Sequence, residues 1–74
     1  MAIETYSQVE LKRRRQMDIV WIETKFATVG RYIKVKHNGD WQDGWQVIKV
    51  YATRPADHVR QFARDYTRMA TYQE

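Results

Sequence analysis

The chain has no cysteine, one serine and one proline among its 74 residues. Without cysteine it can form no disulfide, no thiolate zinc site and no thiol nucleophile. Its one serine, Ser7, and its two histidines, His37 and His58, are too few and too scattered to predict a nucleophile with its base and orienting group. We therefore expect no catalytic residues, and the chain is predicted not to be an enzyme.

Metal ligands and cofactor motifs are also scarce. The loop at residues 38–44 has oxygen side chains at Asn38, Asp40 and Asp43, but no distal glutamate follows at the spacing of a calcium loop. Asparagine and aspartate near glycine are typical of turns, where their side chains hydrogen-bond to nearby backbone. We expect neither a metal site nor a cofactor.

Long hydrophobic runs are absent, because no stretch reaches the ~18 apolar residues of a membrane-spanning helix. We expect no membrane partner and a cytoplasmic location, in the host cell's cytoplasm if the chain is viral. Hydrophobic residues make up 43% and charged residues 30% of the chain, a balance typical of a globular domain. Since so small a domain has a thin core, its aromatic side chains must supply much of the stability.

The positive charge is unevenly distributed. The net charge is +4, and residues 1–16 contribute half of it, since four cations there outnumber two glutamates. The four cations are consecutive: Lys12, Arg13, Arg14 and Arg15. Such a basic run favours a polyanionic partner, and the alternative is a solubilising tail.

The first residues allow two interpretations. Ser7 and Glu10 have the capping-box spacing of a helix start, which predicts a short helix over residues 8–16. The apolar residues of the segment form no stripe of helical period, so the alternative is a flexible arm. The chain is thus divided into a basic N-terminal arm or short helix at residues 1–17 and a single small α+β domain at residues 18–74.

Three segments have the residue preferences of strands. Residues 18–28 are rich in β-branched and aromatic side chains, and residues 31–37 and 45–53 alternate in polarity. In the second of these segments, Ile33 and Val35 are expected to face inward.

Two glycine-containing pairs lie between the second and third of these segments. Asn38-Gly39 is the strongest hairpin signal in the chain, because the favoured two-residue turn has positive φ at both positions. Asp43-Gly44 is a second pair of the same kind, five residues later. One pair is expected to be the hairpin turn and the other a bulge or loop bend.

Residues 55–74 predict an amphipathic helix. Pro55 suits a first helical turn, and Asp57 suits the positive end of the helix dipole. Apolar side chains then recur at helical spacing: Val59, Phe62, Ala63, Tyr66, Met69 and Ala70. The predicted fold is α+β: a three-stranded antiparallel β-meander with this C-terminal helix packed across one face and an optional short N-terminal helix.

One candidate binding feature is a row of arginines on this predicted helix. Arg60, Arg64 and Arg68 recur every four residues, which places them about 6 Å apart along a helix axis. Such a row can meet successive phosphates. The alternative is a solvated face on which the arginines pair with Asp57 and Asp65.

A second candidate is the polar face of the predicted strand at residues 31–37. Tyr32, Lys34 and Lys36 are expected to point outward, with Lys49 and Tyr51 beside them. Aromatic rings interleaved with cations on a sheet suit base stacking and phosphate neutralisation. The alternative is an ordinary polar strand face that keeps the sheet edge from aggregating.

A third candidate is a pair of tryptophans beside the predicted turn. If Asn38-Gly39 makes the hairpin turn, Trp41 and Trp45 lie four residues apart and so on the same face of a strand. One of them is expected to close the core and the other to be an exposed anchor for a partner. Which tryptophan has which role stays open.

Two resemblances to known families accompany these patterns. VGRYIKVK at residues 29–36 and DGWQVIKV at residues 43–50 resemble the strand–turn–strand core of SH3-like barrels of the KOW type. This resemblance implies an SH3-like sheet in part and a nucleic-acid or ribonucleoprotein contact. The wider pattern over residues 19–69 resembles small phage and metagenomic proteins of unassigned function, which implies a viral accessory role.

Together these patterns predict a small, non-catalytic, phage-encoded binding protein that contacts nucleic acid or a nucleoprotein complex. The expected contact residues are Tyr32, Lys34, Lys36, Trp41, Trp45, Arg60, Arg64, Arg68, Lys12, Arg13, Arg14 and Arg15. One alternative is a phage anti-defence inhibitor that binds a host protein directly, and another is a structural homodimer formed through a sheet edge. The chain is expected to be a monomer or a homodimer.

Overall fold

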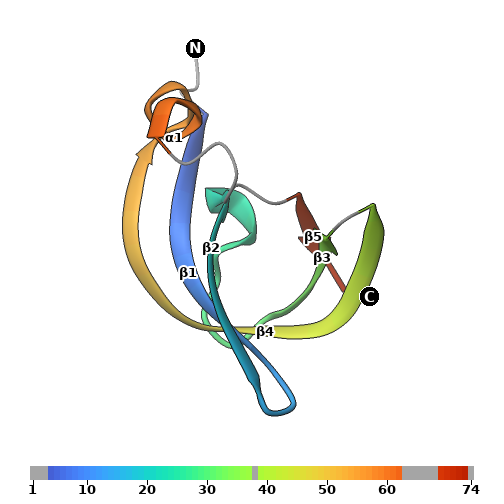
Figure 1. Cartoon of the computed structure of the whole chain (residues 1–74). Coiled ribbons are helices and arrows are strands. Elements are labelled where there is room, and N and C mark those ends of the chain that lie inside the picture. The colour runs from blue at the N-terminus through green and yellow to red at the C-terminus, as the bar shows by residue number, and fades with distance from the viewer. Residues whose placement is uncertain (1–3, 38, 63–68, 74) are drawn as a thin grey trace.

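A five-stranded antiparallel sheet forms most of the protein (Figure 1). The computed structural model describes residues 4–37, 39–62 and 69–73. The elements, in chain order, are β1 (Thr5–Arg13), β2 (Gln16–Glu23), the 3-10 helix η1 (Thr24–Phe26), β3 (Tyr32–His37), β4 (Asp40–Pro55), α1 (Ala56–Phe62) and β5 (Ala70–Tyr72). The strand order across the sheet is β2-β1-β4-β3-β5.

The predicted three-stranded meander with a long C-terminal helix is wrong. The sheet has five strands, and the helix that follows β4 is the seven-residue α1. Residues 70–72, which were expected inside the helix, instead form β5 and pair with β3. Among the described residues, β5 is the strand that bonds to the backbone N–H and C=O groups on this edge of β3. Pairing these backbone groups favours a strand here more than the helical spacing of the apolar residues favours a helix.

The predicted short N-terminal helix is also wrong, because β1 occupies that segment. Ser7, Val9 and Leu11 are fully buried at alternate positions, which is the period of a strand. β1 lies in the interior of the sheet and pairs with both β2 and β4. The hydroxyl of Ser7 bonds to the hydroxyls of Thr24 and Thr53, each at 2.9 Å, rather than to a helix N–H.

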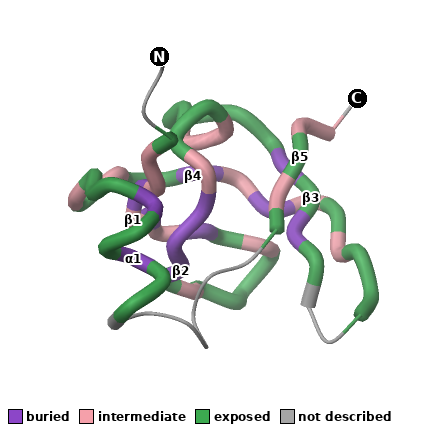
Figure 2. The backbone as a smooth tube through the Cα atoms, turned by 90° about the horizontal axis from the view of Figure 1, so that it is seen from above, coloured by how far each residue is buried: buried purple, intermediate pink, exposed green. Residues whose placement is uncertain are grey.

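The main core is formed by residues from four strands whose buried stretches lie toward the middle of the molecule (Figure 2). Its members are Val9, Leu11, Val20, Ile22, Ile33, Val35, Trp45 and Val47. Phe26 of η1 and Tyr72 of β5 pack against this core. The expectation that Ile33 and Val35 face inward is confirmed.

A second, smaller cluster lies on the opposite face of the sheet. Trp21 is one residue out of phase with Val20 and Ile22, so it points to the other side of β2. There it packs with Val59 of α1 and with the partly buried side chain of Tyr6. This contact attaches α1 to the sheet. No helix among the described residues is both long enough and apolar enough to cross a membrane.

β4 is a long, strongly bent strand that lies in the middle of the sheet and curves from the β3 side to the β1 side (Figure 1). It pairs with β3 over residues 40–46 and with β1 over residues 46–55. The register shifts three times along these ladders, twice against β1 and once against β3. Because a bulge adds a residue to one strand and bends it, these shifts allow one strand to serve both halves of the sheet.

Candidate nucleic-acid interface

The outer face of β3 has the alternation of rings and cations expected from the sequence. Tyr32, Lys34 and Lys36 are exposed, and the two residues between them are fully buried. Because β3 is a regular strand here, the three exposed side chains point to the same side of the sheet.

Trp41 joins these side chains from β4. In the β3–β4 ladder Trp41 is directly opposite Lys36, and residues opposite each other in a ladder share a face of the sheet. Trp41 is 48% exposed and Tyr32 is 52% exposed, so both rings are accessible to a partner. We call Tyr32, Lys34, Lys36 and Trp41 together the β3 surface.

The two tryptophans that follow the β3–β4 turn lie on opposite faces. Trp45 is 4% exposed and belongs to the core, so the exposed member of the pair is Trp41. The expectation that they share a face is wrong, because β4 has one residue more than β3 at Asp43-Gly44. Gly44 has φ +81°, a conformation that glycine adopts without steric cost.

This bulge is held from two sides. The Nε of Arg13 donates a hydrogen bond of 2.8 Å to the carbonyl oxygen of Asp43. The backbone N–H of Gly44 donates a hydrogen bond of 2.7 Å to the side-chain oxygen of Gln73, just after β5. The bulge therefore connects the end of β1, the start of β4 and the C-terminal strand, and it fixes the position of Trp41 relative to the core.

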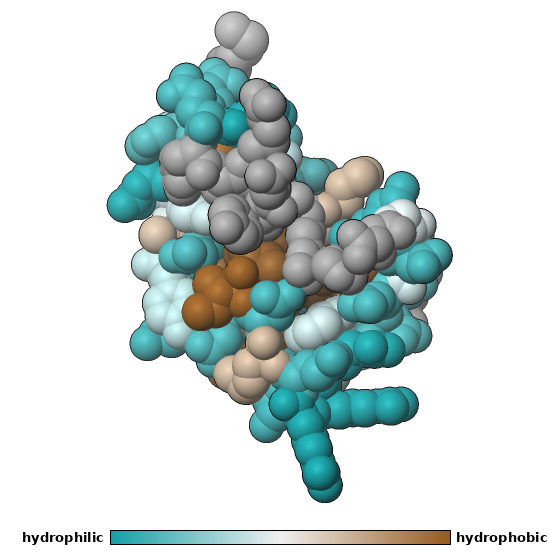
Figure 3. Space-filling view, viewed as in Figure 1, coloured by the Kyte–Doolittle hydropathy of each residue, from teal (hydrophilic) through white to brown (hydrophobic). Residues whose placement is uncertain are grey.

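The four consecutive cations lie at the tip of the β1–β2 hairpin. We call Lys12, Arg13, Arg14 and Arg15 the cationic tip. Strongly hydrophilic side chains project from the molecule at the end of this hairpin (Figure 3). Arg13 pairs with Gln16, so Arg14 and Arg15 form a two-residue turn. These residues are therefore part of a hairpin that belongs to the sheet.

Arg14 has an unfavourable backbone conformation for a residue with a side chain. Its φ is +57°, and it is the one residue other than glycine with positive φ in the described part of the chain. Such a conformation costs roughly 1–2 kcal/mol for an L-residue with a Cβ. A glycine or an asparagine would suit this turn position better than arginine does.

The β3 surface and the cationic tip are connected across the outer face of the sheet. Gln46 on β4 is opposite Lys12 of β1 on one side and opposite Tyr32 of β3 on the other. Since neighbouring strands are about 4.8 Å apart, Lys12 and Tyr32 are separated by about 10 Å at the backbone. Lys12 of the cationic tip therefore shares the outer face of the bent sheet with the rings and cations of the β3 surface.

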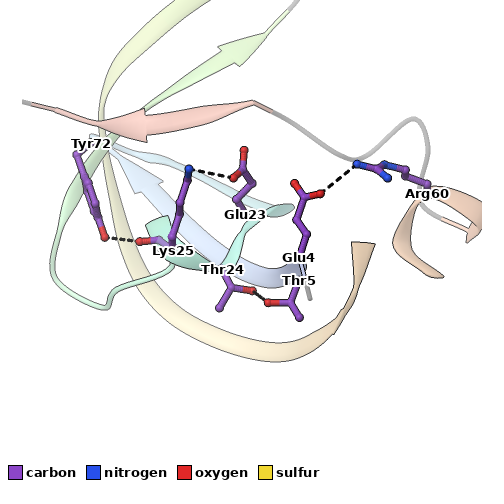
Figure 4. Close-up of polar contacts among 7 residues, drawn as sticks. All are labelled: Glu4, Thr5, Glu23, Thr24, Lys25, Arg60 and Tyr72. Carbon is purple, nitrogen blue, oxygen red and sulfur yellow. Dashed lines mark hydrogen bonds and ion pairs between the residues drawn. The ribbon is translucent and has the colours of Figure 1, made fainter. Parts of the chain in front are cut away.

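Of the predicted row of arginines, the described member is Arg60, which lies on α1 and not on β3 or the β1–β2 hairpin. The side chain of Arg60 is held by the carboxylates of Glu4 and Asp57, each at 3.5 Å, and the Glu4 contact is drawn in Figure 4. Arg64 and Arg68 lie outside the described residues. The expectation of a helical row rested on a helix through residue 74, which β5 excludes.

Lys49 and Tyr51 were expected beside the β3 surface, but they lie against β1. The hydroxyl of Tyr51 donates a hydrogen bond of 2.6 Å to Glu10, and the Lys49 ammonium lies 5.0 Å from the centre of the Tyr51 ring. The hydrogen bond to Glu10, together with partial desolvation and the negative charge of that carboxylate, raises the pKa of Tyr51. These side chains already have polar partners within the protein.

Thr71 is a neighbour of the β3 surface that the sequence did not indicate. It is exposed on β5 and directly opposite Lys34. This position was not predicted for Thr71, because the helical spacing of apolar residues assigned the segment to a helix. A signal was nevertheless present, since Thr71 and Tyr72 both favour strands over helices.

Ser7 is the one serine of the chain and lies inside the protein. Ser7 is fully buried and shares its hydroxyl with Thr24 and Thr53 in a network that also reaches Thr5. Buried in that network, it is inaccessible to a substrate. In the part of the chain that the structure describes, no three His, Asp or Glu side chains come together as a metal site would need.

Comparisons with known proteins gave no match to a family model, a curated protein or a solved structure. The resemblances to SH3-like barrels of the KOW type and to small phage proteins thus stay predictions from the sequence.

Proposed function

We propose that the protein is a non-catalytic binding protein that contacts nucleic acid through the β3 surface, with the cationic tip as a second contact. The observation that supports this most is the pairing of Lys36 with the exposed ring of Trp41, on the same face as Tyr32 and Lys34. Among the described residues, neither Lys34 nor Lys36 forms an ion pair with a carboxylate.

The binding mechanism combines two effects. Each lysine that neutralises a phosphate releases counterions from the nucleic acid, which favours binding at low salt. Each exposed ring can stack on a base, and this contact is worth about 1–3 kcal/mol per base. We further propose that this contact takes place in the cytoplasm, and in that of the host cell if the chain is viral.

The test is a fluorescence-anisotropy titration of labelled DNA and RNA over a range of salt concentrations. We expect log affinity to fall linearly with log salt, with a slope of about −0.7 to −0.9 for each neutralised phosphate. Absence of binding to every nucleic acid at low salt would refute the proposal. A host protein retained from lysate after nuclease treatment would then favour the anti-defence inhibitor.

A specific observation also favours self-association as a second candidate function. β2 is an eight-residue edge strand that pairs with β1 in a continuous register, without a bulge. Its outward-facing side chains include Met17 and Ile19, which are 56% and 51% exposed. Regular edge strands with apolar side chains tend to pair with another chain. Light scattering that gives one chain mass at all concentrations would exclude a homodimer.

A further inference from the structure

The two rings of the β3 surface are attached to the backbone at points far apart along the strand. Tyr32 and the Lys36–Trp41 pair are separated by four residues along β3, which is about 13 Å at ~3.3 Å per residue. Stacked bases in a duplex are only about 3.4 Å apart and cover one another's faces. Rings attached this far apart can therefore each stack on a base only if the bases are unstacked, as they can be in a single strand.

Two lysines accompany the rings on this face, one between them and one beside the second ring. Lys34 lies midway and Lys36 lies next to Trp41, and both project on the same side as the rings. Thr71 of β5, opposite Lys34, adds an exposed hydroxyl that can bond to a phosphate or a sugar. Along the strand direction, Lys34 lies between the two rings, and Lys36 is level with Trp41. Rings with cations between and beside them suit the bases and phosphates of one strand.

The remaining elements do not suit a duplex at this surface. Proteins that read a duplex insert an exposed helix or a two-stranded ribbon into a groove. α1 has seven residues, its Val59 is buried against Trp21, and its Arg60 is held by two carboxylates. The cationic tip does have the shape of a ribbon, so a duplex would bind there rather than to the β3 surface.

We propose that the β3 surface binds single-stranded nucleic acid, with one base on Tyr32, a second base on Trp41, and phosphates of the same strand at Lys34 and Lys36. This assignment rests on the nucleic-acid-binding function proposed above and names its ligand. A strand that continues past Tyr32 meets Gln46 and then Lys12 of the cationic tip, because these residues follow one another across the sheet.

The first experiment compares three labelled probes of equal length by anisotropy. The probes are a thymidine strand of about 12 nucleotides, an abasic strand with the same phosphates, and the corresponding duplex. This length is within the ~4–16 nucleotides that one OB-fold domain covers. We expect the thymidine strand to bind about ten-fold more tightly than the abasic strand and the duplex, since only its bases can stack on both rings. A uridine strand then distinguishes RNA from DNA.

Single substitutions identify the surface. Tyr32→Ala and Trp41→Ala should each weaken binding to the thymidine strand by about five-fold or more, because each removes one stacked base. Lys36→Gln should reduce the salt slope by about 0.7, the value for one single-strand phosphate. The matched controls are Tyr51→Ala and Lys49→Gln, which alter an exposed ring and a cation placed against β1, and they should bind as the unmodified protein does.

Tryptophan fluorescence gives an independent measurement. Of the three tryptophans, Trp41 is exposed while Trp21 and Trp45 are buried, so a stacked base should quench Trp41 selectively. The quenching should disappear in Trp41→Phe, which keeps a ring at the site and should retain most of the affinity. Quenching that persists in this variant would contradict the proposal.

The outcomes separate this proposal from the function on which it rests. If all three probes bind equally and the ring variants bind normally, the protein binds nucleic acid through charge alone and single-strand binding at β3 is wrong. If the duplex binds best and Arg14→Ala abolishes that binding, the tip is the site and the proposal is again wrong. If no probe binds, the proposed function itself fails.

Discussion

The first and last strands of the chain are held in the sheet by different means. β1 lies between β2 and β4, forms ladders with both, and has three fully buried side chains. β5 has three residues and pairs only with β3 at the edge of the sheet. The difference shows that a strand in the middle of a sheet is stabilised by its ladders and core contacts, whereas a short edge strand depends on a few side chains.

For β5, the side chain that matters most is Tyr72. Its ring packs edge-on against Phe26 at 5.1 Å, and the Arg31 guanidinium lies 4.3 Å from the centre of the ring. Its hydroxyl donates a hydrogen bond to the carbonyl oxygen of Lys25, as drawn in Figure 4. We therefore expect removal of a buried side chain of β1 to destabilise the whole protein, and removal of the Tyr72 side chain to release only the edge strand β5.

The largest expected effect is that of Leu11→Ala in β1. Leu11 is fully buried in the main core, and a cavity at such a site lowers the free energy of unfolding by about 2–5 kcal/mol. Urea unfolding followed by circular dichroism measures this loss. A loss below about 0.5 kcal/mol, the size expected at a surface position, would contradict the central role of β1.

A smaller and more local effect is expected for Tyr72→Ala. The substitution removes an aromatic pair worth about 0.5–1.5 kcal/mol and the hydrogen bond to Lys25, worth about 1 kcal/mol. Hydrogen exchange should accelerate at the Lys36 amide, which donates to the Met69 carbonyl oxygen at 2.8 Å beside β5.

The control for this local effect lies in β1. Amides that β1 donates to β2 and β4 should exchange at unchanged rates in Tyr72→Ala, since those ladders do not involve β5. Tyr72→Phe should have an intermediate effect, because it keeps the ring but removes the hydroxyl. Equal acceleration throughout the sheet would show that β5 is not a separate unit of stability.

A gain in stability is expected at the tip that closes β1. Arg14→Gly removes the strain of a positive φ. Arg15→Gly is the control, because it makes the same change in charge and chain flexibility at a residue whose φ is not positive. The first variant should be more stable than the second by about 1–2 kcal/mol. Thermal unfolding of the two variants side by side measures the difference, and equal stabilities would contradict the strained turn.

The smallest expected effect is a loss of stability at high pH, which comes from the hydrogen bond between Tyr51 of β4 and Glu10 of β1. Because Glu10 raises the pKa of Tyr51 in the folded state, the neutral phenol is favoured by folding. This contribution is fully present below the ordinary tyrosine pKa of about 10 and is lost as the pH rises through the higher folded-state value. Tyr51→Phe should lack this alkaline loss, which unfolding free energies measured from neutral to alkaline pH would detect.

The hairpin of β3 and β4 was predictable from the sequence. Alternation placed Ile33 and Val35 inside, and positive φ at Gly39 and Gly44 fits the turn and the bulge expected from two glycine pairs. The roles of Trp41 and Trp45 were not predictable, because a single extra residue in one strand reverses the face of everything beyond it. Sequence alone does not say which glycine pair inserts that residue.

The two ends of the chain were assigned to the wrong kind of element. Ser7 with Glu10 has the spacing of a helix cap, and the same segment also has the alternation of a strand with Val9 and Leu11 buried. Spacing within one segment cannot show that β2 and β4 are available on both sides as partners. At the C-terminus, the open edge of β3 selected a strand that local helical periodicity did not indicate.

The shared use of β4 has a consequence for how the molecule could be divided. Every strand is joined to the rest through this one sixteen-residue segment, directly or through a single neighbour. A fragment that ends before residue 40 would leave β1 and β3 without their common partner, so neither half is expected to persist alone. The protein should accordingly melt in one step, and a ligand on the outer face of β3 should raise the melting temperature of the entire molecule.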